Sequence, residues 1–116
     1  MTDQQTIGQA AENQAFAHLL EKGLQLLERN YRCRRGEIDL IMRDGDATVF
    51  VEVRFRRNRR FGSAAESVEW RKQNKLVTTA EHYFQKHPQL AQHPARFDVV
   101  SIDGNELEWI KNAFQA

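Results

Sequence analysis

The chain is poor in cysteine and has no long apolar segment. Cys33 is the single cysteine among 116 residues, so no internal disulfide can form, and zinc sites built from paired cysteines are excluded. No apolar run approaches the roughly 20 residues that a membrane-spanning helix needs. The segment from Met1 to Ala11 has neither a basic nor an apolar stretch, so we expect no secretory signal. These absences favour a cytoplasmic protein that does not act at a membrane.

Several motifs of known catalytic sites are also missing. The sequence contains no glycine-rich phosphate loop, no nucleophile elbow and no internal repeat. Its four histidines, at positions 18, 82, 87 and 93, lack the spacing of metal ligands. The length and the 41% of hydrophobic residues suit one domain with a modest core. We therefore predict a single domain over residues 1–116, in which residues 1–6 form a disordered polar tail.

Lysine is absent from a long stretch that is rich in arginine. The net charge of the whole chain is only +1, but ten arginines lie in the 32 residues from Arg29 to Arg60. The planar fork of arginine matches the geometry of phosphate. The stretch therefore predicts contact with nucleic acid about as strongly as it predicts a solvated loop. The candidate nucleic-acid-binding residues are Arg34, Arg35, Arg56, Arg57, Arg59 and Arg60.

Two segments on either side of Gly45 and Asp46 alternate in the manner of β-strands. Gly45-Asp46 is typical of a two-residue hairpin loop, and we predict a hairpin over residues 37–55 with Asp44 opposite Ala47. Apolar residues occupy every second position of both segments. They are Ile38, Leu40 and Met42 before the turn, and Val49, Val51, Val53 and Phe55 after it.

This register places two carboxylates opposite each other. Asp39 then faces Glu52, and Glu37 faces Arg54. A shift of one residue would put one apolar set on the wrong face of the sheet. Like charges whose Cβ atoms are about 5 Å apart destabilise a sheet. Asp39 and Glu52 therefore need a shared proton, a neighbouring cation or a metal ion.

Helical periodicity marks two further segments. Apolar spacing predicts a helix from Ile7 to Lys22, with Glu12 near the middle of its apolar face. A buried carboxylate needs a partner, and a pair with an arginine is as good an explanation as a place in a site. A second helix is predicted from Val68 to Lys86, where Lys72 lies one turn before the buried stripe. Ordinary helix surface is the simpler interpretation of Lys72.

The remaining segments complete an α/β domain. Strands are predicted over residues 24–32, 96–102 and 106–110, the last two joined by a turn at Asp103-Gly104-Asn105. The element order is thus helix, strand, hairpin, helix, strand, strand. A central mixed β-sheet flanked by helices is the economical architecture for this order.

The three acids suggest one chemistry. If Glu12 points toward Asp39 and Glu52, the cluster suits Mg²⁺ or Mn²⁺, which bind carboxylates together with water and substrate phosphate. Such a metal lowers the pKa of a bound water and neutralises charge that develops on a phosphodiester. With arginines at its rim, the cluster favours metal-dependent cleavage of phosphodiesters.

Five motifs carry a resemblance to a known family. They are Asn-Tyr-Arg at 30–32, Gly-Glu-Ile-Asp-Leu-Ile at 36–41, Phe-Val-Glu-Val-Arg at 50–54, Arg-Phe-Asp-Val-Val at 96–100 and the segment 108–114. Together they resemble the YraN family of small bacterial proteins over residues 8–114. That family is similar to archaeal-type Holliday junction resolvases, with a restriction-endonuclease-like fold and a PD-(D/E)xK-type site.

The resemblance implies a metal-dependent nuclease that acts on DNA at branched or single-stranded structures. It makes Glu12 the acid of the helix, Asp39 and Glu52 the metal-binding acids, and Arg54 the position of the lysine of the motif. Arginine stays protonated and cannot act as a base. Lys72 is therefore a candidate for a displaced catalytic ammonium.

The sequence is also consistent with two other functions and with a homodimeric assembly. The chain could be a non-catalytic nucleic-acid-binding protein of the same fold. It could also be a protein-interaction module whose acids form internal pairs, such as Glu37 with Arg54. Because resolvases cut two symmetric strands as dimers, a homodimer is an expectation by analogy.

Overall fold

The computed structural model describes residues 3–55 and 68–115, with side chains from residue 8 onward. The chain forms α1 (Asp3–Glu21), β1 (Gln25–Cys33), β2 (Gly36–Asp44), β3 (Ala47–Phe55), α2 (Trp70–Lys86), a short 3₁₀ helix (Leu90–Gln92), β4 (Ala95–Asp103) and β5 (Glu106–Phe114). Arg56, Arg57, Arg59 and Arg60, four of the predicted nucleic-acid-binding residues, lie outside the described residues.

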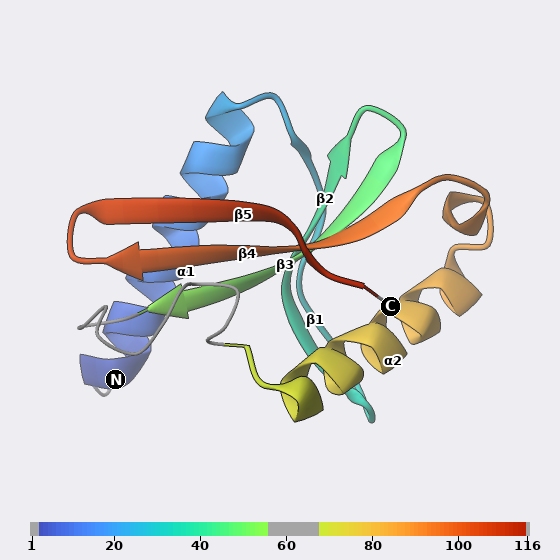
Figure 1. Cartoon of the computed structure of the whole chain (residues 1–116), viewed down its shortest axis with the longest axis horizontal. Coiled ribbons are helices and arrows are strands. Elements are labelled where there is room, and N and C mark those ends of the chain that lie inside the picture. The colour runs from blue at the N-terminus through green and yellow to red at the C-terminus, as the bar shows by residue number, and fades with distance from the viewer. Residues whose placement is uncertain (1–2, 56–67, 116) are drawn as a thin grey trace.

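The five strands form one mixed sheet in the order β1-β2-β3-β4-β5. All neighbours are antiparallel except β3 and β4, which are parallel. A parallel pair needs a crossover connection, and α2 lies on the chain between these two strands (Figure 1). The predicted α/β architecture, a central mixed sheet flanked by helices, is confirmed, and it is consistent with a restriction-endonuclease-like fold.

Each helix covers its own hydrophobic core. The cluster under α1 joins residues of the helix, such as Leu19, to Leu40 and Val51 of the sheet. The cluster under α2 joins Leu76 and its neighbours to Phe50. The alternation of β3 is the reason for two cores, because Phe50 and Val51 point to opposite faces. The sheet is thus buried on both sides between the helices.

Three elements differ from the sequence-based expectation. α1 begins at Asp3, so residues 3–6 are helical where a disordered tail is predicted. β5 runs to Phe114 and passes Ile110, the predicted end, with Asn112 at a φ of 52°. Ile38 packs in the cluster under α2, whereas the alternation predicts that it shares a face with Leu40 under α1.

No helix in the described part of the chain is long and apolar enough to cross a membrane.

Candidate active site

The hairpin brings Asp39 to the point where β2 and β3 stop pairing. The ladder between the two strands runs from Asp44 opposite Ala47 to Leu40 opposite Val51, which confirms the predicted register. One residue further along β2, Oδ2 of Asp39 accepts a hydrogen bond of 2.8 Å from the backbone N–H of Val53. A carboxylate thus continues the contact between the strands after the backbone ladder has ended.

Asp39 and Glu52 form the pair that the register predicts. Their side chains share a hydrogen bond, and the pKa of Asp39 is raised from 3.8 to about 7. Desolvation is the largest cause, followed by the hydrogen bond to Glu52 and the charge of Glu52. The Val53 amide and the charge of Lys72 act in the opposite direction. At pH 7 Asp39 is therefore protonated in about half of the molecules.

Lys72 of α2 supplies the cation at this pair. Its Nζ lies 3.3 Å from Oε2 of Glu52, whose side chain is only 6% exposed. The contact is an ion pair without hydrogen-bond geometry, since Oε2 is buried and makes no hydrogen bond to the described residues. A buried carboxylate oxygen in this condition is costly, so Glu52 has remaining capacity for a ligand.

The local sequence explains why α2 comes so close to the acids. Gly36 opens β2, and a Cβ built there would lie only 3.0 Å from Oγ1 of Thr79 in α2. Glycine therefore permits the close approach of strand and helix. Gln73 donates a hydrogen bond of 2.9 Å from Nε2 to the carbonyl oxygen of Val68. This bond ties the segment before α2 to the first turn of the helix.

Glu12 reaches the same region from α1 but has its own partner. Its Oε1 lies 2.6 Å from Nε of Arg29, and both side chains are largely buried. Arg29 also donates to Asn13 and lies 5.3 Å from the ring centre of Phe16. The pairing of Glu12 with an arginine is the simpler of the two explanations that its sequence position allows.

A cavity connects Glu12 with Asp39. It has a volume of about 220 Å³, and its lining also includes Gly8, Val53 and Phe55. A second, polar cavity of about 550 Å³ shares Gly8 and Glu12 with it and extends to the edge strand β1. A cavity therefore leads to Asp39 from the side of α1, while Lys72 contacts Glu52 from the side of α2.

Two carboxylates are the donors that this site offers to a metal ion. Within residues 8–55 and 68–115, no three side chains among histidine, cysteine, aspartate and glutamate are grouped so that they could hold a metal ion. Two carboxylates with water and substrate phosphate are sufficient for Mg²⁺. Asp39 and Glu52 supply these two, and the buried Oε2 of Glu52 is a donor without a hydrogen bond. The pair fits such an ion, and Glu12 does not complete a three-acid group.

The other predicted residues are distributed around this centre. Arg54 lies in β3 two residues after Glu52, half-buried, and pairs in the ladder with Ser101. Glu37 forms an ion pair of 3.3 Å with Arg32 of β1. The predicted pair of Glu37 with Arg54 is therefore wrong. Arg34 and Arg35 are exposed at the turn between β1 and β2.

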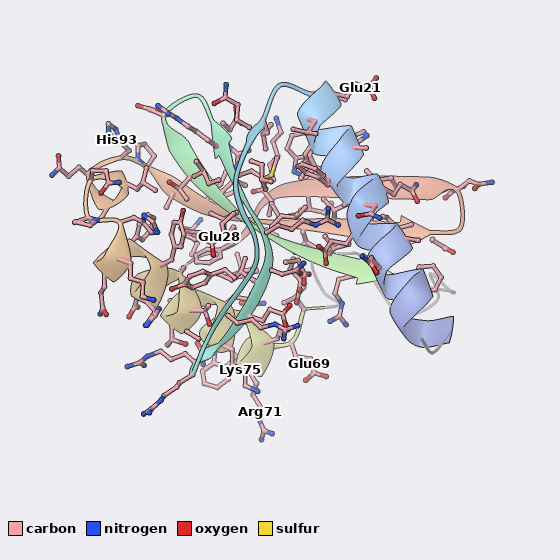
Figure 2. All side chains as sticks on the ribbon, turned by 180° about the vertical axis from the view of Figure 1, so that it is seen from behind. Glu21, Glu28, Glu69, Arg71, Lys75 and His93 are labelled. Atoms are coloured by element: carbon pink, nitrogen blue, oxygen red, sulfur yellow. The ribbon has the colours of Figure 1, made fainter. Side chains whose placement is uncertain are left out.

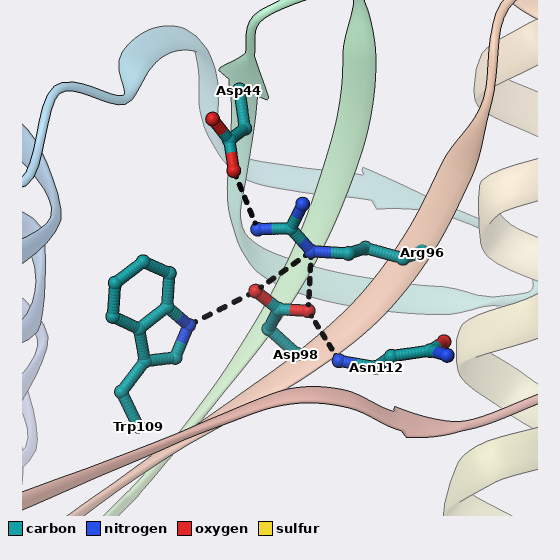
Figure 3. A network of polar contacts seen from close by, with 5 residues as sticks. All are labelled: Asp44, Arg96, Asp98, Trp109 and Asn112. Carbon is teal, nitrogen blue, oxygen red and sulfur yellow. Dashed lines mark hydrogen bonds and ion pairs between the residues drawn. The ribbon is translucent and has the colours of Figure 1, made fainter.

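Sequence reasoning overlooked one polar network. Asp98 of β4 is fully buried and accepts hydrogen bonds from Arg96, from the indole of Trp109 at 2.9 Å and from the amide of Asn112 at 2.9 Å (Figure 3). Arg96 continues the network to Asp44, 2.9 Å away. The motif Arg-x-Asp at 96–98 was its only signal in the sequence. The network fastens β5 to β4 and to the hairpin turn.

Fold and site define an α/β domain with a hydrogen-bonded acidic pair and a lysine at the opening between two strands. The chain belongs to the Uncharacterised protein family UPF0102, whose sequence profile matches residues 11–102. This is the YraN family, so the predicted membership is confirmed. The chain is 51% identical to a UPF0102 protein of Stutzerimonas stutzeri, with all of both chains covered. It is also 51% identical to one of Pseudomonas putida, with 93% and 92% covered, and 50% identical to one of a Janthinobacterium species, with 99% and 92% covered.

Proposed function

We propose that this protein is a metal-dependent nuclease that hydrolyses DNA phosphodiesters. The observation that carries the proposal is the hydrogen-bonded pair of Asp39 and Glu52 with Lys72 beside it. Two carboxylates and a cation lie at the point where two strands separate, and the loss of their hydration lowers the stability of the fold. A purely structural pair would be expected to satisfy the buried oxygen of Glu52 with a hydrogen bond.

Asp39 and Glu52 would hold Mg²⁺ or Mn²⁺. When bound, such an ion supplies a water of lowered pKa and neutralises charge that develops on the phosphodiester.

Lys72 is better placed than Arg54 for the role of the basic residue. Its ammonium group touches Glu52 at 3.3 Å, so it lies where it orients an attacking water or stabilises the transition state. The guanidinium of Arg54 is not a proton acceptor, and it would contribute charge and N–H donors. The role that the resemblance gives to a lysine two residues after the glutamate would therefore pass to a lysine of α2.

A second candidate function is binding of nucleic acid without cleavage. It is favoured by the ion pair of Glu12 with Arg29, which occupies the third acid. This alternative predicts binding that weakens as salt rises, because phosphate contacts release counterions. It predicts no cleavage with any divalent metal.

Cleavage assays on single-stranded, duplex and branched DNA, each with Mg²⁺, Mn²⁺ or EDTA, test the proposal. We expect metal-dependent cleavage that falls at least about a hundredfold in Asp39→Asn and in Glu52→Gln. The control Glu21→Gln changes an exposed acid at the other end of α1 (Figure 2) and should leave the rate unchanged. Equal cleavage by the wild type and both site variants, or none with any substrate and metal, would refute the proposal.

A further inference from the structure

Trp70, the first residue of α2, is unusually exposed. Its side chain is 73% exposed, whereas Leu20, Leu26 and Phe55, the other exposed large hydrophobic residues of the described chain, reach only 40–44%. Tryptophan is normally largely buried because it offers so much apolar surface. The packing of the described residues gives no reason for a tryptophan at this position.

Three cations follow Trp70 in the first two turns of α2. Arg71 and Lys75 are exposed, Lys72 is 41% exposed, and the first turn of α2 contains no acid. Figure 2 shows Arg71 and Lys75 at the beginning of the helix, with Glu69 just before it. A helix N-terminus is stabilised by acids and destabilised by cations. The charges of Arg71 and Lys75 therefore do not stabilise the start of the helix, and they would complement an anionic ligand.

Trp70 belongs to the same end of α2 as the acidic pair. It precedes Lys72, the residue that contacts Glu52, by two positions. In an α-helix this is about 3 Å along the axis and about 200° around it. A nucleic-acid strand that passes the acids would therefore have to follow the first turn of α2 around the helix to reach Trp70. Arg71 lies between Lys72 and Trp70 on this path.

The acids themselves are recessed. Glu52 is only 5% exposed, and the cavity that reaches Asp39 measures about 220 Å³. A strand that has left the paired and stacked duplex bends into such a site more readily than a rigid double helix does. An unpaired strand also presents its bases to aromatic side chains, and stacking on them tolerates any sequence.

We propose that the nucleic acid bound by this protein is unpaired next to the acidic pair, and that Trp70 stacks on one of its bases. Arg71 and Lys75 contact the neighbouring phosphates. The identity of the ligand rests on the proposed function, but the stacking does not require that the strand is cut. Trp70 would thus be a residue that selects single-stranded or locally opened nucleic acid.

Binding in EDTA separates this proposal from cleavage. The anisotropy of a labelled 20-nucleotide single strand, and of the same sequence as a duplex, would be measured with the wild type, Trp70→Ala, Trp70→Phe and the control Leu20→Ala. Loss of one stacked base weakens binding by about 5- to 100-fold. We expect this loss for Trp70→Ala with the single strand only, while Trp70→Phe retains most of the affinity. Leu20→Ala, which removes an exposed apolar side chain elsewhere, should bind like the wild type.

Each outcome decides the question. Unchanged single-strand affinity in Trp70→Ala would overturn the proposal even if the wild type cleaves DNA. A loss in Trp70→Ala that is equal for both forms would overturn it too, because stacking needs an unpaired base. A selective loss without metal-dependent cleavage would support it while the proposed nuclease activity fails. Absence of binding to either form would refute it.

Discussion

The carboxylate of Asp39 accepts a hydrogen bond of 2.8 Å from the backbone N–H of Val53, one residue beyond the last backbone pair between β2 and β3. This bond holds Asp39 against β3 while its side chain also bonds Glu52. Asp39 therefore links β2 to β3 through a hydrogen bond, and its pKa is raised in the same position. Its titration is the most direct measure of the site.

Stability should fall as the pH rises toward 7 because of Asp39. Its pKa is about 7 in the folded protein, compared with 3.8 ordinarily. Between these values the folded state holds a proton that the unfolded state has released. The stabilisation is thus complete at low pH and is lost as the pH rises through 7. Asp39→Asn removes the titration and keeps an acceptor for Val53, so it should be more stable than the wild type at pH 8 by roughly 1–3 kcal/mol.

Urea unfolding at pH 5 and pH 8 measures this difference. The free energy of unfolding of Glu21→Gln, which changes an exposed acid, should follow the wild type at both values. If Asp39→Asn and the wild type change in parallel between pH 5 and pH 8, Asp39 does not have a raised pKa.

The hairpin was predictable because its signals are local. The turn at Gly45 and Asp46 fixes the register, and the register fixes the opposition of Asp39 and Glu52. Ile38 was misplaced because simple alternation assumes a ladder that continues past Leu40. The observed ladder to β3 ends there, and Ile38 packs under α2 instead.

Partners that depend on tertiary structure were harder to predict. A helical wheel places Glu12 on the buried face but does not say that Arg29 of β1 meets it. Lys72 looked like ordinary helix surface, since its contact with Glu52 depends on how closely α2 packs against β2. Asp98 gave little signal beyond the motif Arg-x-Asp, because its other two donors come from β5, a strand whose length the sequence underestimates.

The pair of Glu12 and Arg29 should be coupled more strongly than an exposed pair. Its side chains are 14% and 28% exposed, whereas those of Glu37 and Arg32 are 38% and 75% exposed. A double-mutant cycle with Glu12→Gln and Arg29→Gln should give a coupling of about 1–2 kcal/mol in urea unfolding. The matched cycle at Glu37 and Arg32 should give less than about 0.5 kcal/mol. Equal couplings would mean that Glu12 is not held by Arg29.

Removal of the buried carboxylate at Asp98 should be severe. Asp98→Ala leaves Nε of Arg96, the indole of Trp109 and the amide of Asn112 without their acceptor. Breaking a buried charged pair costs about 3–5 kcal/mol, and we expect a loss of this size in urea unfolding. Asp44→Ala, which removes the outer and 38% exposed partner of Arg96, should cost about 1 kcal/mol or less. Similar losses for the two variants would contradict a central role of Asp98.

Substitutions of Lys72 and Arg54 should affect the cleavage rate very differently if Lys72 of α2 supplies the catalytic ammonium in place of a lysine at position 54. Lys72 contacts Glu52 at 3.3 Å, so Lys72→Ala should lower kcat by about 10²- to 10³-fold with little change in KM. Arg54→Ala should act mainly on KM, as expected for a residue that contributes charge to binding. Lys72→Arg keeps the charge but cannot release a proton. It restores the rate if the group only stabilises charge, and fails to do so if Lys72 must give up its proton. A large loss of kcat in Arg54→Ala with none in Lys72→Ala would show that Arg54 of β3, and not Lys72, is the catalytic cation.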